Sequence, residues 1–266
     1  MYRDSQEKDV QMLEKRFIEL SRLAYQREII TYTDFLNLNE QNILHTLPKD
    51  RLFTGYRSFG GYFMAERQMA AFIPDALYLR YGKSELTMEE LDFPFCAVKI
   101  SPLNRKFAGE MSHRDYLGAV LNLGIDRSKT GDILIDGSDA VIFVHRDLES
   151  FLKEELTRVR HTSVRLDSID IQDFDYTPRY EEIRGTVASV RLDSLLALAF
   201  SSSRSRLSGL IEGGRVFVNG KLITSNGYQL KDGDIVSVRG MGKFRFEGTQ
   251  GTTRKNRITV SVRRYV

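Results

Sequence analysis

Apolar residues recur at intervals of three and four positions near the start of the chain. Over residues 4–27 they form one stripe, and charged residues occupy most other positions. The stripe consists of Val10, Leu13, Phe17, Leu20 and Ala24. This spacing predicts an amphipathic helix whose apolar side packs on the rest of the protein.

A second helix is expected further along, with its cap at Thr33 or Asp34 and its end before Pro48. Its apolar positions are Phe35, Leu36, Leu38, Ile43 and Leu44. The aromatic, glycine-containing run at 53–63 is compatible with stacking of bases, but packing in a core is the favoured interpretation. Residues 1–65 are therefore expected to form an N-terminal helical region.

Between residues 66 and 170 short apolar runs alternate with helical patterns. They predict strand, helix, two strands joined at Asp136-Gly137, helix and strand, in that order. The expected bounds are 95–100, 114–123, 131–135, 140–144, 147–159 and 163–169, with extra strands near 69–73 and 76–79. This βαββαβ succession predicts a ferredoxin-like sandwich, the topology of RNA-recognition domains. The aromatic signature that stacks bases in those domains is not present on residues 140–145, so RNA contact from this domain would need another surface.

The last part of the chain combines turn signals with short apolar runs. Residues 171–184 are acidic and contain a proline, which favours a linker. In residues 185–266 two short helices are expected, the second following three serines and ending at Gly213-Gly214. Asn219-Gly220 predicts a hairpin, and further strands are expected at 235–239, 243–247 and 257–263. The whole chain is thus predicted to be α+β, with three folded parts.

The formal net charge of +3 conceals two opposite parts. From Gly185 onward the chain has 14 Lys and Arg against 5 Asp and Glu, a balance of +9, and the first 184 residues carry −6. A basic module is typical of proteins that bind a polyanion, most often nucleic acid, because neutralised phosphates release counterions. The alternative is that the basic surface is simply solvated. Charge alone does not distinguish the two interpretations, so the sequence motifs are needed.

The apolar pattern of the second helix of the basic module predicts which face of that helix carries the arginines. Because Leu207 and Ile211 face inward, Arg204 lies on the outer face and Arg206 flanks it. The N–H groups of the first turn, beside Ser203, suit a phosphate. The candidate RNA contacts are Arg191, Ser203, Arg204, Ser205, Arg206, Asn219, Lys221, Arg239, Lys243 and Arg245.

The basic module resembles an S4 domain. The marks of this resemblance are Arg191-Leu192-Asp193, Ser203-Arg204-Ser205, Gly214, Val218-Asn219-Gly220-Lys221 and Gly233-Asp234. The whole chain resembles the YlmH family of bacterial S4-domain proteins, through the C-terminal position of this domain and the run from Ser112-His113-Arg114-Asp115 to Gly131-Asp132-Ile133. The resemblance implies an N-terminal helical part, a central RNA-recognition-like domain and an S4 end.

The same resemblance implies a function. S4 domains bind structured RNA, so 23S rRNA, tRNA or both are the expected ligands. The family is associated with the large ribosomal subunit carrying peptidyl-tRNA, with quality control of stalled nascent chains and its proteins, and with the neighbourhood of division genes. These partners are expectations that rest on the resemblance.

Enzymes that carry S4 domains have motifs that this sequence does not share. Pseudouridine synthases place a long catalytic region after the domain, tyrosyl-tRNA synthetases need nucleotide motifs upstream, and methyltransferases need a glycine-rich loop. The two His-Arg-Asp runs, at 113–115 and 145–147, lack the other kinase motifs. Ser112 and Asp115 fit a helix capping box, and a catalytic triad cannot be assumed from residues so close in sequence.

Composition narrows the remaining possibilities. Cys96 is the single cysteine, which excludes an internal disulfide framework, and the four histidines have no ligand spacing. No apolar run approaches the ~18 residues of a membrane helix, and the N-terminus does not resemble a secretory signal. We therefore expect a soluble cytoplasmic protein without metal, cofactor or membrane contact.

These observations favour a non-enzymatic RNA-binding protein that acts on the ribosome, with Arg204, Arg206 and the helix N-terminus on the RNA backbone. Arg191, Lys221 and Lys243 would set the register. Two alternatives stay open. The first is a protein-interaction adaptor in cell division with secondary RNA binding, and the second is an RNA-modifying enzyme.

Overall fold

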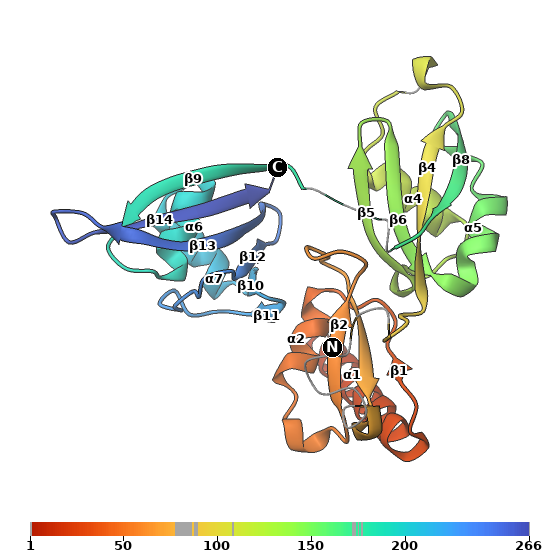
Figure 1. The fold of residues 1–266 in the computed structure, drawn as a ribbon, viewed down its shortest axis with the longest axis horizontal. Coiled ribbons are helices and arrows are strands. Elements are labelled where there is room, and N and C mark those ends of the chain that lie inside the picture. Colours follow the sequence, from red (N-terminus) through yellow and green to blue (C-terminus); the bar gives the residue numbers. More distant parts are fainter. Residues whose placement is uncertain are drawn as a thin grey trace. The chain divides into compact units, whose positions relative to one another are not determined.

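The computed structural model describes residues 2–77, 87, 90–107, 109–171, 174, 176 and 178–265. The chain divides into two compact units, Met1–Tyr176 and Thr177–Val266, both drawn in Figure 1. The first unit holds the N-terminal and central regions, and the second holds the basic module. Within the described ranges no helix is both long enough and apolar enough to span a bilayer.

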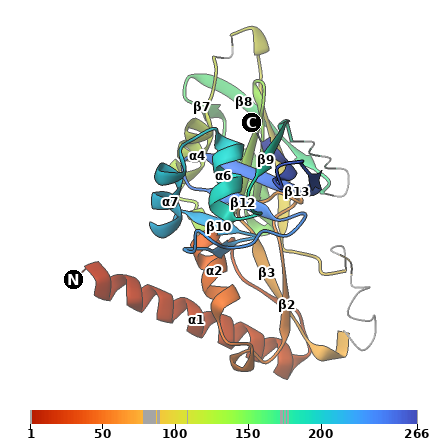
Figure 2. The ribbon, with the colours of Figure 1, turned by 90° about the vertical axis from the view of Figure 1, so that its left-hand side faces the viewer.

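The N-terminal region is a small sheet with helices packed against it. Its elements are α1 (Tyr2–Arg27), β1 (Thr31–Tyr32), α2 (Leu38–Thr46), β2 (Gly55–Phe59) and β3 (Met69–Ile73), and the strand order is β1-β3-β2. The stripe of α1 is buried at Phe17, Leu20 and Ala24, but Val10 is 38% exposed. Figure 2 shows the reason, since the first turns of α1 extend beyond the sheet. The predicted stripe is therefore too long at its N-terminal end.

Helix α2 begins later than the sequence predicts. Its N-cap is Asn37, whose side chain accepts the backbone N–H groups of Asn39 and Glu40. The expected cap, Thr33, is used in the sheet, where its hydroxyl accepts the backbone N–H of Ala70 at 2.9 Å. Phe35 and Leu36 consequently precede the helix, both buried, and the prediction that they belong to it is wrong.

The expected boundary at residue 65 falls inside this sheet. Strand β2 lies before it and β3 after it, and the two pair in register from Gly55 opposite Ile73 to Phe59 opposite Met69. The strand expected at 69–73 is present as β3. Of the strand expected at 76–79, residues 76 and 77 are helical and 78 and 79 lie outside the described residues.

The central region has the predicted ferredoxin-like topology. Its elements are β4 (Phe95–Pro102), α4 (His113–Asn122), β5 (Thr130–Asp136), β6 (Asp139–His145), α5 (Glu149–Glu155), β7 (Arg158–Val159) and β8 (Thr162–Ile169). The antiparallel strands lie in the order β5-β6-β4-β8-β7. Short 3-10 turns lie between these elements at Arg105–Phe107, Arg127–Lys129 and Arg146–Leu148, and another follows α2 of the N-terminal region at Lys49–Arg51.

Helix α5 is shorter than the expected 147–159. It starts after the 3-10 turn at Arg146–Leu148 and ends at Glu155, because Leu156 leaves the helical conformation with a ψ of 79°. Val159 is buried, but as part of β7, where it pairs with Thr162 of β8. The apolar residues at 147–159 therefore belong to two elements, the helix α5 and the strand β7.

The central sheet is buried on both faces. Val98 and Ile142 lie on one face, in the core beneath α4 and α5. Phe95 and Phe143 lie on the other, in a second core that includes Phe35 of the N-terminal region. The two faces explain why these strands are almost continuously apolar.

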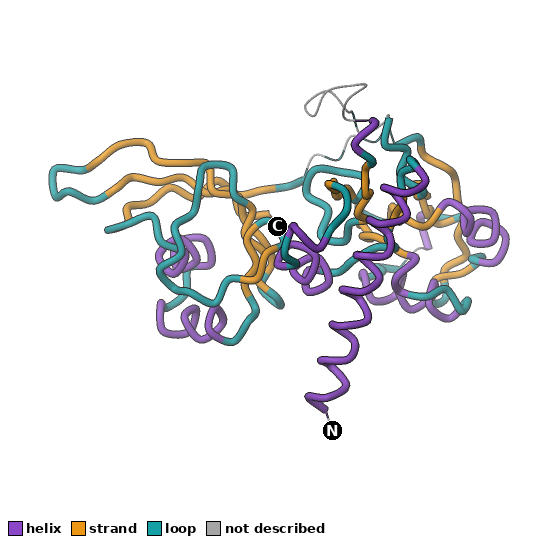
Figure 3. The backbone as a smooth tube through the Cα atoms, turned by 90° about the horizontal axis from the view of Figure 1, so that it is seen from below, coloured by secondary structure: helices purple, strands orange, loops and turns teal. Residues whose placement is uncertain are grey.

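The C-terminal unit is a six-stranded antiparallel sheet with two helices on one face, as Figure 3 shows. Its elements are β9 (Tyr180–Val187), α6 (Leu192–Phe200), α7 (Arg204–Glu212), β10 (Val216–Val218), β11 (Lys221–Leu222), β12 (Ile235–Val238), β13 (Gly242–Thr252) and β14 (Ile258–Tyr265). The strand order is β11-β10-β12-β13-β14-β9. The core lies between helices and sheet and contains Leu195, Leu207 and Phe244, all fully buried. Asn219 and Gly220 have the positive φ values that the predicted hairpin requires.

The acidic segment at 171–184 does not act as a linker along its whole length. Ile171 and Phe174 pack on the central core. From Tyr180 the chain is strand β9, which pairs with β14 along its full length. Glu181 of β9 forms an ion pair of 2.6 Å with Arg264 of β14, so the acidic residues neutralise part of the basic module.

Candidate nucleic-acid interface

The start of α7 is an open helix N-terminus. Helix α6 ends in the left-handed conformation at Ser201, and α7 begins three residues later with Ser203 as its N-cap. The Ser203 hydroxyl lies 3.3 Å from that of Ser205 and does not cap the backbone N–H groups of the first turn. Such a terminus attracts an anion, because its N–H groups and the helix dipole both favour negative charge.

A buried carboxylate, Asp193, contacts Arg191 at the start of α6 and, through Ser194, is linked to Arg204 at the start of α7. Asp193 is 7% exposed, and its Oδ1 lies 3.2 Å from Nε of Arg191. The same oxygen accepts the backbone N–H of Ser194 at 2.9 Å. The Ser194 hydroxyl in turn accepts a hydrogen bond from the guanidinium of Arg204. The Arg191-Leu192-Asp193 motif thus orients arginines from the starts of both helices.

The charge at this site is positive after pairing. Of Arg191, Arg204 and the exposed Arg206, only Arg191 has an ion-pair partner among the residues that the structure describes, and that partner is Asp193. Cations near a helix N-terminus repel its dipole, and an anion bound between them removes this repulsion. This combination of cations and an open helix N-terminus is compatible with a bound anion. We call Arg191, Ser203, Arg204, Ser205 and Arg206 the helix-side group.

The side chain of Asn219 forms hydrogen bonds within the C-terminal unit. Its Nδ2 donates to Asp234 at 2.8 Å, and its Oδ1 accepts the backbone N–H of Ile235 at 2.9 Å. Asp234, 8% exposed, also accepts the backbone N–H of Lys231. The amide of Asn219 therefore ties two turns together, whereas Lys221, two residues later, is exposed at the sheet edge.

Three of the predicted RNA contacts lie on the face of the C-terminal sheet that is opposite the helices α6 and α7. Along β13 the buried Phe244 and Phe246 face the helices, so Lys243 and Arg245 face away from them. Arg239 lies on that same side, with its guanidinium 5.5 Å from the ring centroid of Phe217. The structure therefore divides the candidates into the helix-side group and a sheet-side group of Arg239, Lys243 and Arg245.

In the central domain, the sheet face that RNA-recognition domains use for RNA is covered by side chains of the N-terminal region. RNA-recognition domains bind RNA with aromatic side chains on the open face of their sheet. Here Phe95 and Phe143 occupy that face, and both are buried. Phe35 packs on Phe95 with ring centroids 5.3 Å apart, and Tyr62 stacks on Phe143 at 5.7 Å. Tyr62 comes from the aromatic run at 53–63, so this ring serves the core.

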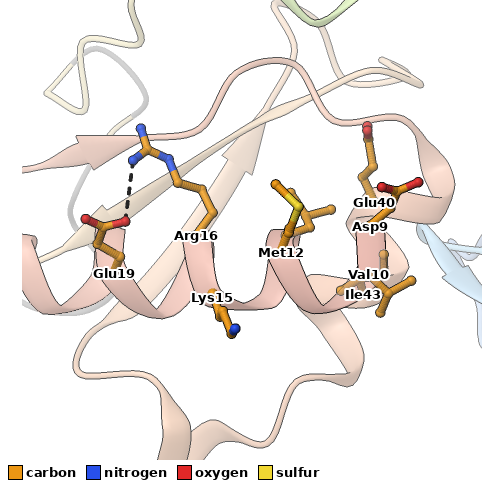
Figure 4. A pocket seen from close by; sticks show the side chains of 9 residues that line it. Asp9, Val10, Met12, Lys15, Arg16, Glu19, Glu40 and Ile43 are labelled. Carbon is orange, nitrogen blue, oxygen red and sulfur yellow. Dashed lines mark ion pairs between the residues drawn. The ribbon is translucent and has the colours of Figure 1, made fainter. Parts of the chain in front are cut away.

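A groove runs along α1 of the N-terminal region. Figure 4 shows Val10, Met12 and Ile43 among its lining side chains, with an ion pair between Arg16 and Glu19 at 3.7 Å. Met12 is 69% exposed. The lining has no arrangement suited to catalysis, and the described residues contain no group of His, Cys, Asp and Glu that could hold a metal ion.

Comparison with known proteins follows the same division of the chain. Residues 88–173 match the family model described as "Putative RNA-binding domain in YlmH", and residues 190–236 match the S4 domain. Ribosome-associated protein quality control protein P2 of Bacillus subtilis (strain 168) is 31% identical over 258 residues, which cover 97% of this chain and 96% of that protein. The chain belongs to the YlmH family. A solved structure named cell division protein ylmH, from Streptococcus pneumoniae, has 22% identity and a TM-score of 0.48, covering 64% of this chain and 95% of that one.

The YlmH-type motif of the central domain has structural tasks here. Ser112 donates through its backbone N–H and its hydroxyl to Asp115, at 2.8 and 2.7 Å, which completes the capping box of α4. These hydrogen bonds lower the pKa of Asp115. Asp132 accepts hydrogen bonds from the Tyr62 hydroxyl and from the backbone N–H of Arg67. The motif therefore joins the N-terminal region to the central sheet.

Two exposed cations at the tip of the β13–β14 hairpin, Arg254 and Lys255, are not among the predicted RNA contacts. Counting charges within the basic module would have found them. Eight of its fourteen cations follow Val238, with Glu247 as the single acid among them. The remaining six cations are accompanied by four acids.

Proposed function

We propose that this YlmH-family protein binds RNA of the large ribosomal subunit, 23S rRNA or peptidyl-tRNA, in the cytoplasm, during quality control of stalled nascent chains. It acts by binding and not by catalysis. The ribosome-associated name of its Bacillus subtilis relative and its two matched domains support this proposal. The observation that carries it is the helix-side group, in which buried Asp193 pairs with Arg191 and is linked through Ser194 to Arg204 at the open N-terminus of α7.

In this mechanism the backbone of the RNA is held by charge and geometry together. Arg204 and Arg206 contact phosphates from the first turn of α7, and the N–H groups of that turn donate to the same phosphates. Arg191 and Lys221 contact the backbone on either side and set the register. Since phosphates position a protein without specifying bases, the shape of the folded RNA supplies the selectivity.

Sedimentation with purified large ribosomal subunits over a series of salt concentrations tests this proposal. R204A/R206A should weaken binding and lower its salt dependence, because each lost phosphate contact reduces the slope of log K against log salt by about one. The control is K8A/R22A, which removes the same charge from exposed positions of α1. Equal binding by wild type and R204A/R206A, with both folded by circular dichroism, would contradict the proposal.

One observation favours the adaptor alternative, namely the exposed apolar side chains of Val10 and Met12 in the α1 groove. An adaptor should keep its protein partner after nuclease treatment and lose it in M12K. RNA-dependent association alone argues for the first function.

A further inference from the structure

The positive charge of the C-terminal unit is concentrated away from the helix-side group. Residues 239–266 carry eight cations and one acid, a balance of +7, whereas residues 185–238 carry six cations and four acids, a balance of +2. The first of these segments is the β13–β14 hairpin with the residues just before it. The electrostatic attraction of a polyanion to this unit is therefore stronger at the hairpin than at the helices.

The hairpin is longer than the sheet beside it. Strand β12 pairs with β13 only from Gly242 to Arg245, whereas β13 and β14 stay paired as far as Thr252 opposite Ile258. Figures 1 and 3 both show the hairpin extending past α6 and α7 at one end of this unit. The tip therefore reaches a different place from the N-terminus of α7.

The tip has a defined backbone conformation. The N–H of Thr253 donates to the carbonyl of Arg257 at 2.8 Å, and the N–H of Asn256 donates to the carbonyl of Thr253 at 2.9 Å. Arg257 also donates from its guanidinium to the carbonyl of Thr186 in β9, at 2.7 Å. These bonds hold the loop in place, so its cations are presented without a large cost in ordering.

The cations of the hairpin differ in how far they are neutralised. Arg264 pairs with Glu181 at 2.6 Å, and Arg245 and Arg263 share Glu247 at 3.6 and 3.7 Å. Arg254 and Lys255 at the tip are exposed, and neither has an ion-pair partner among the residues that the structure describes. The free charge of the hairpin is thus at its tip.

We infer that the tip of the β13–β14 hairpin is a second RNA contact, in which Arg254 and Lys255 bind phosphates of a double-stranded RNA segment other than the one held by the helix-side group. This inference rests on the proposed function and adds a second attachment point to it. Double-stranded RNA is recognised through its phosphates and shape, which suits a contact made of two flexible cations on an ordered turn. Two separate contacts fix the orientation of a protein on a folded RNA, which one contact cannot do.

The expected size of the effect follows from counterion release. At about 0.1 M salt each phosphate contact on a duplex contributes a factor of about eight to the binding constant. Loss of two contacts in R254A/K255A should therefore weaken binding roughly 60-fold and reduce the salt slope by about two. The reversal R254E/K255E should weaken it further.

The test is fluorescence anisotropy of a short fluorescein-labelled RNA duplex titrated with the full chain over a salt series, repeated as sedimentation with large ribosomal subunits. Wild type, R254A/K255A, R204A/R206A and the charge-matched K8A/R22A are compared. Weaker binding and a lower slope for R254A/K255A, with K8A/R22A unchanged, support the inference. Unchanged binding of both probes by R254A/K255A, or equal losses in K8A/R22A, overturns it.

The two proposals fail separately in this experiment. If R204A/R206A binds like wild type and R254A/K255A does not, the helix-side contact is wrong and the hairpin contact stands. The opposite pattern removes the hairpin contact and leaves the helix-side contact. The tip residues are exposed and outside the core, so circular dichroism should give R254A/K255A the melting curve of wild type.

Discussion

Replacing Asp193 should separate the positioning of the helix-side arginines from their charge. In D193A the Ser194 N–H keeps the carbonyl of Arg191 as an acceptor, at 3.0 Å, but loses the carboxylate. A hydrogen bond to a charged group contributes about 1.5 kcal/mol at the lower end of its range. The ion pair with Arg191, whose side chain is 43% exposed, adds up to about 1 kcal/mol after screening.

The expected destabilisation of D193A is therefore about 2 kcal/mol, and about 1 kcal/mol for D193N, which keeps a neutral acceptor. For a domain of about 60–100 residues, each kcal/mol lowers Tm by about 4–8 °C. D193A should thus lower the Tm of the C-terminal unit by about 8–16 °C. The assay is differential scanning calorimetry of the full chain, with hydrogen exchange of α6 and α7 peptides to assign the loss.

The same variant makes the unit more positive by one charge. A purely electrostatic account expects D193A to bind large ribosomal subunits more tightly at low salt. We expect weaker binding, because Arg191 and Ser194 lose the carboxylate that orients them, and Arg204 depends on Ser194. Tighter binding together with an unchanged Tm would show that Asp193 does not position these arginines.

Two further predictions concern the first unit. Gly61 has a φ of +96°, and an added Cβ would lie 2.2 Å from the ring of buried Phe143, so G61A should destabilise the chain by about 2–4 kcal/mol in urea unfolding. The matched G118A, in open space on α4, should stabilise it by about 0.5–1 kcal/mol, and a similar effect of both would contradict the contact. The Arg146 guanidinium lowers the pKa of Asp92 below its ordinary 3.8. The unfolded chain therefore binds a proton first on acidification, so the stability from this pair is full above about pH 4 and is lost below it. D92N should flatten that part of the pH profile of unfolding, and an unchanged profile would show that the pair contributes nothing.

Caps and turns were predicted correctly where the interacting residues are only a few positions apart in the sequence. Ser112 and Asp115 cap α4 as the sequence indicates, and the Asp136-Gly137 turn joins β5 to β6. Failures came where a distant partner competed for a group. Thr33 was expected to cap a helix, but its hydroxyl bonds to Ala70, far along the chain.

The order and types of the residues thus determined the α+β class, the ferredoxin-like order of the central strands, the S4 end and the basic character of the last third. These depend on period, turn chemistry and charge, which are properties of neighbouring residues. Only the tertiary structure decided which face each side chain occupies. Strand pairing placed Arg239, Lys243 and Arg245 on the side of the sheet opposite Arg204, and packing covered the open face of the central domain with Phe35 and Tyr62. Sidedness depends on contacts between distant segments, and such contacts leave no periodic signal in the chain.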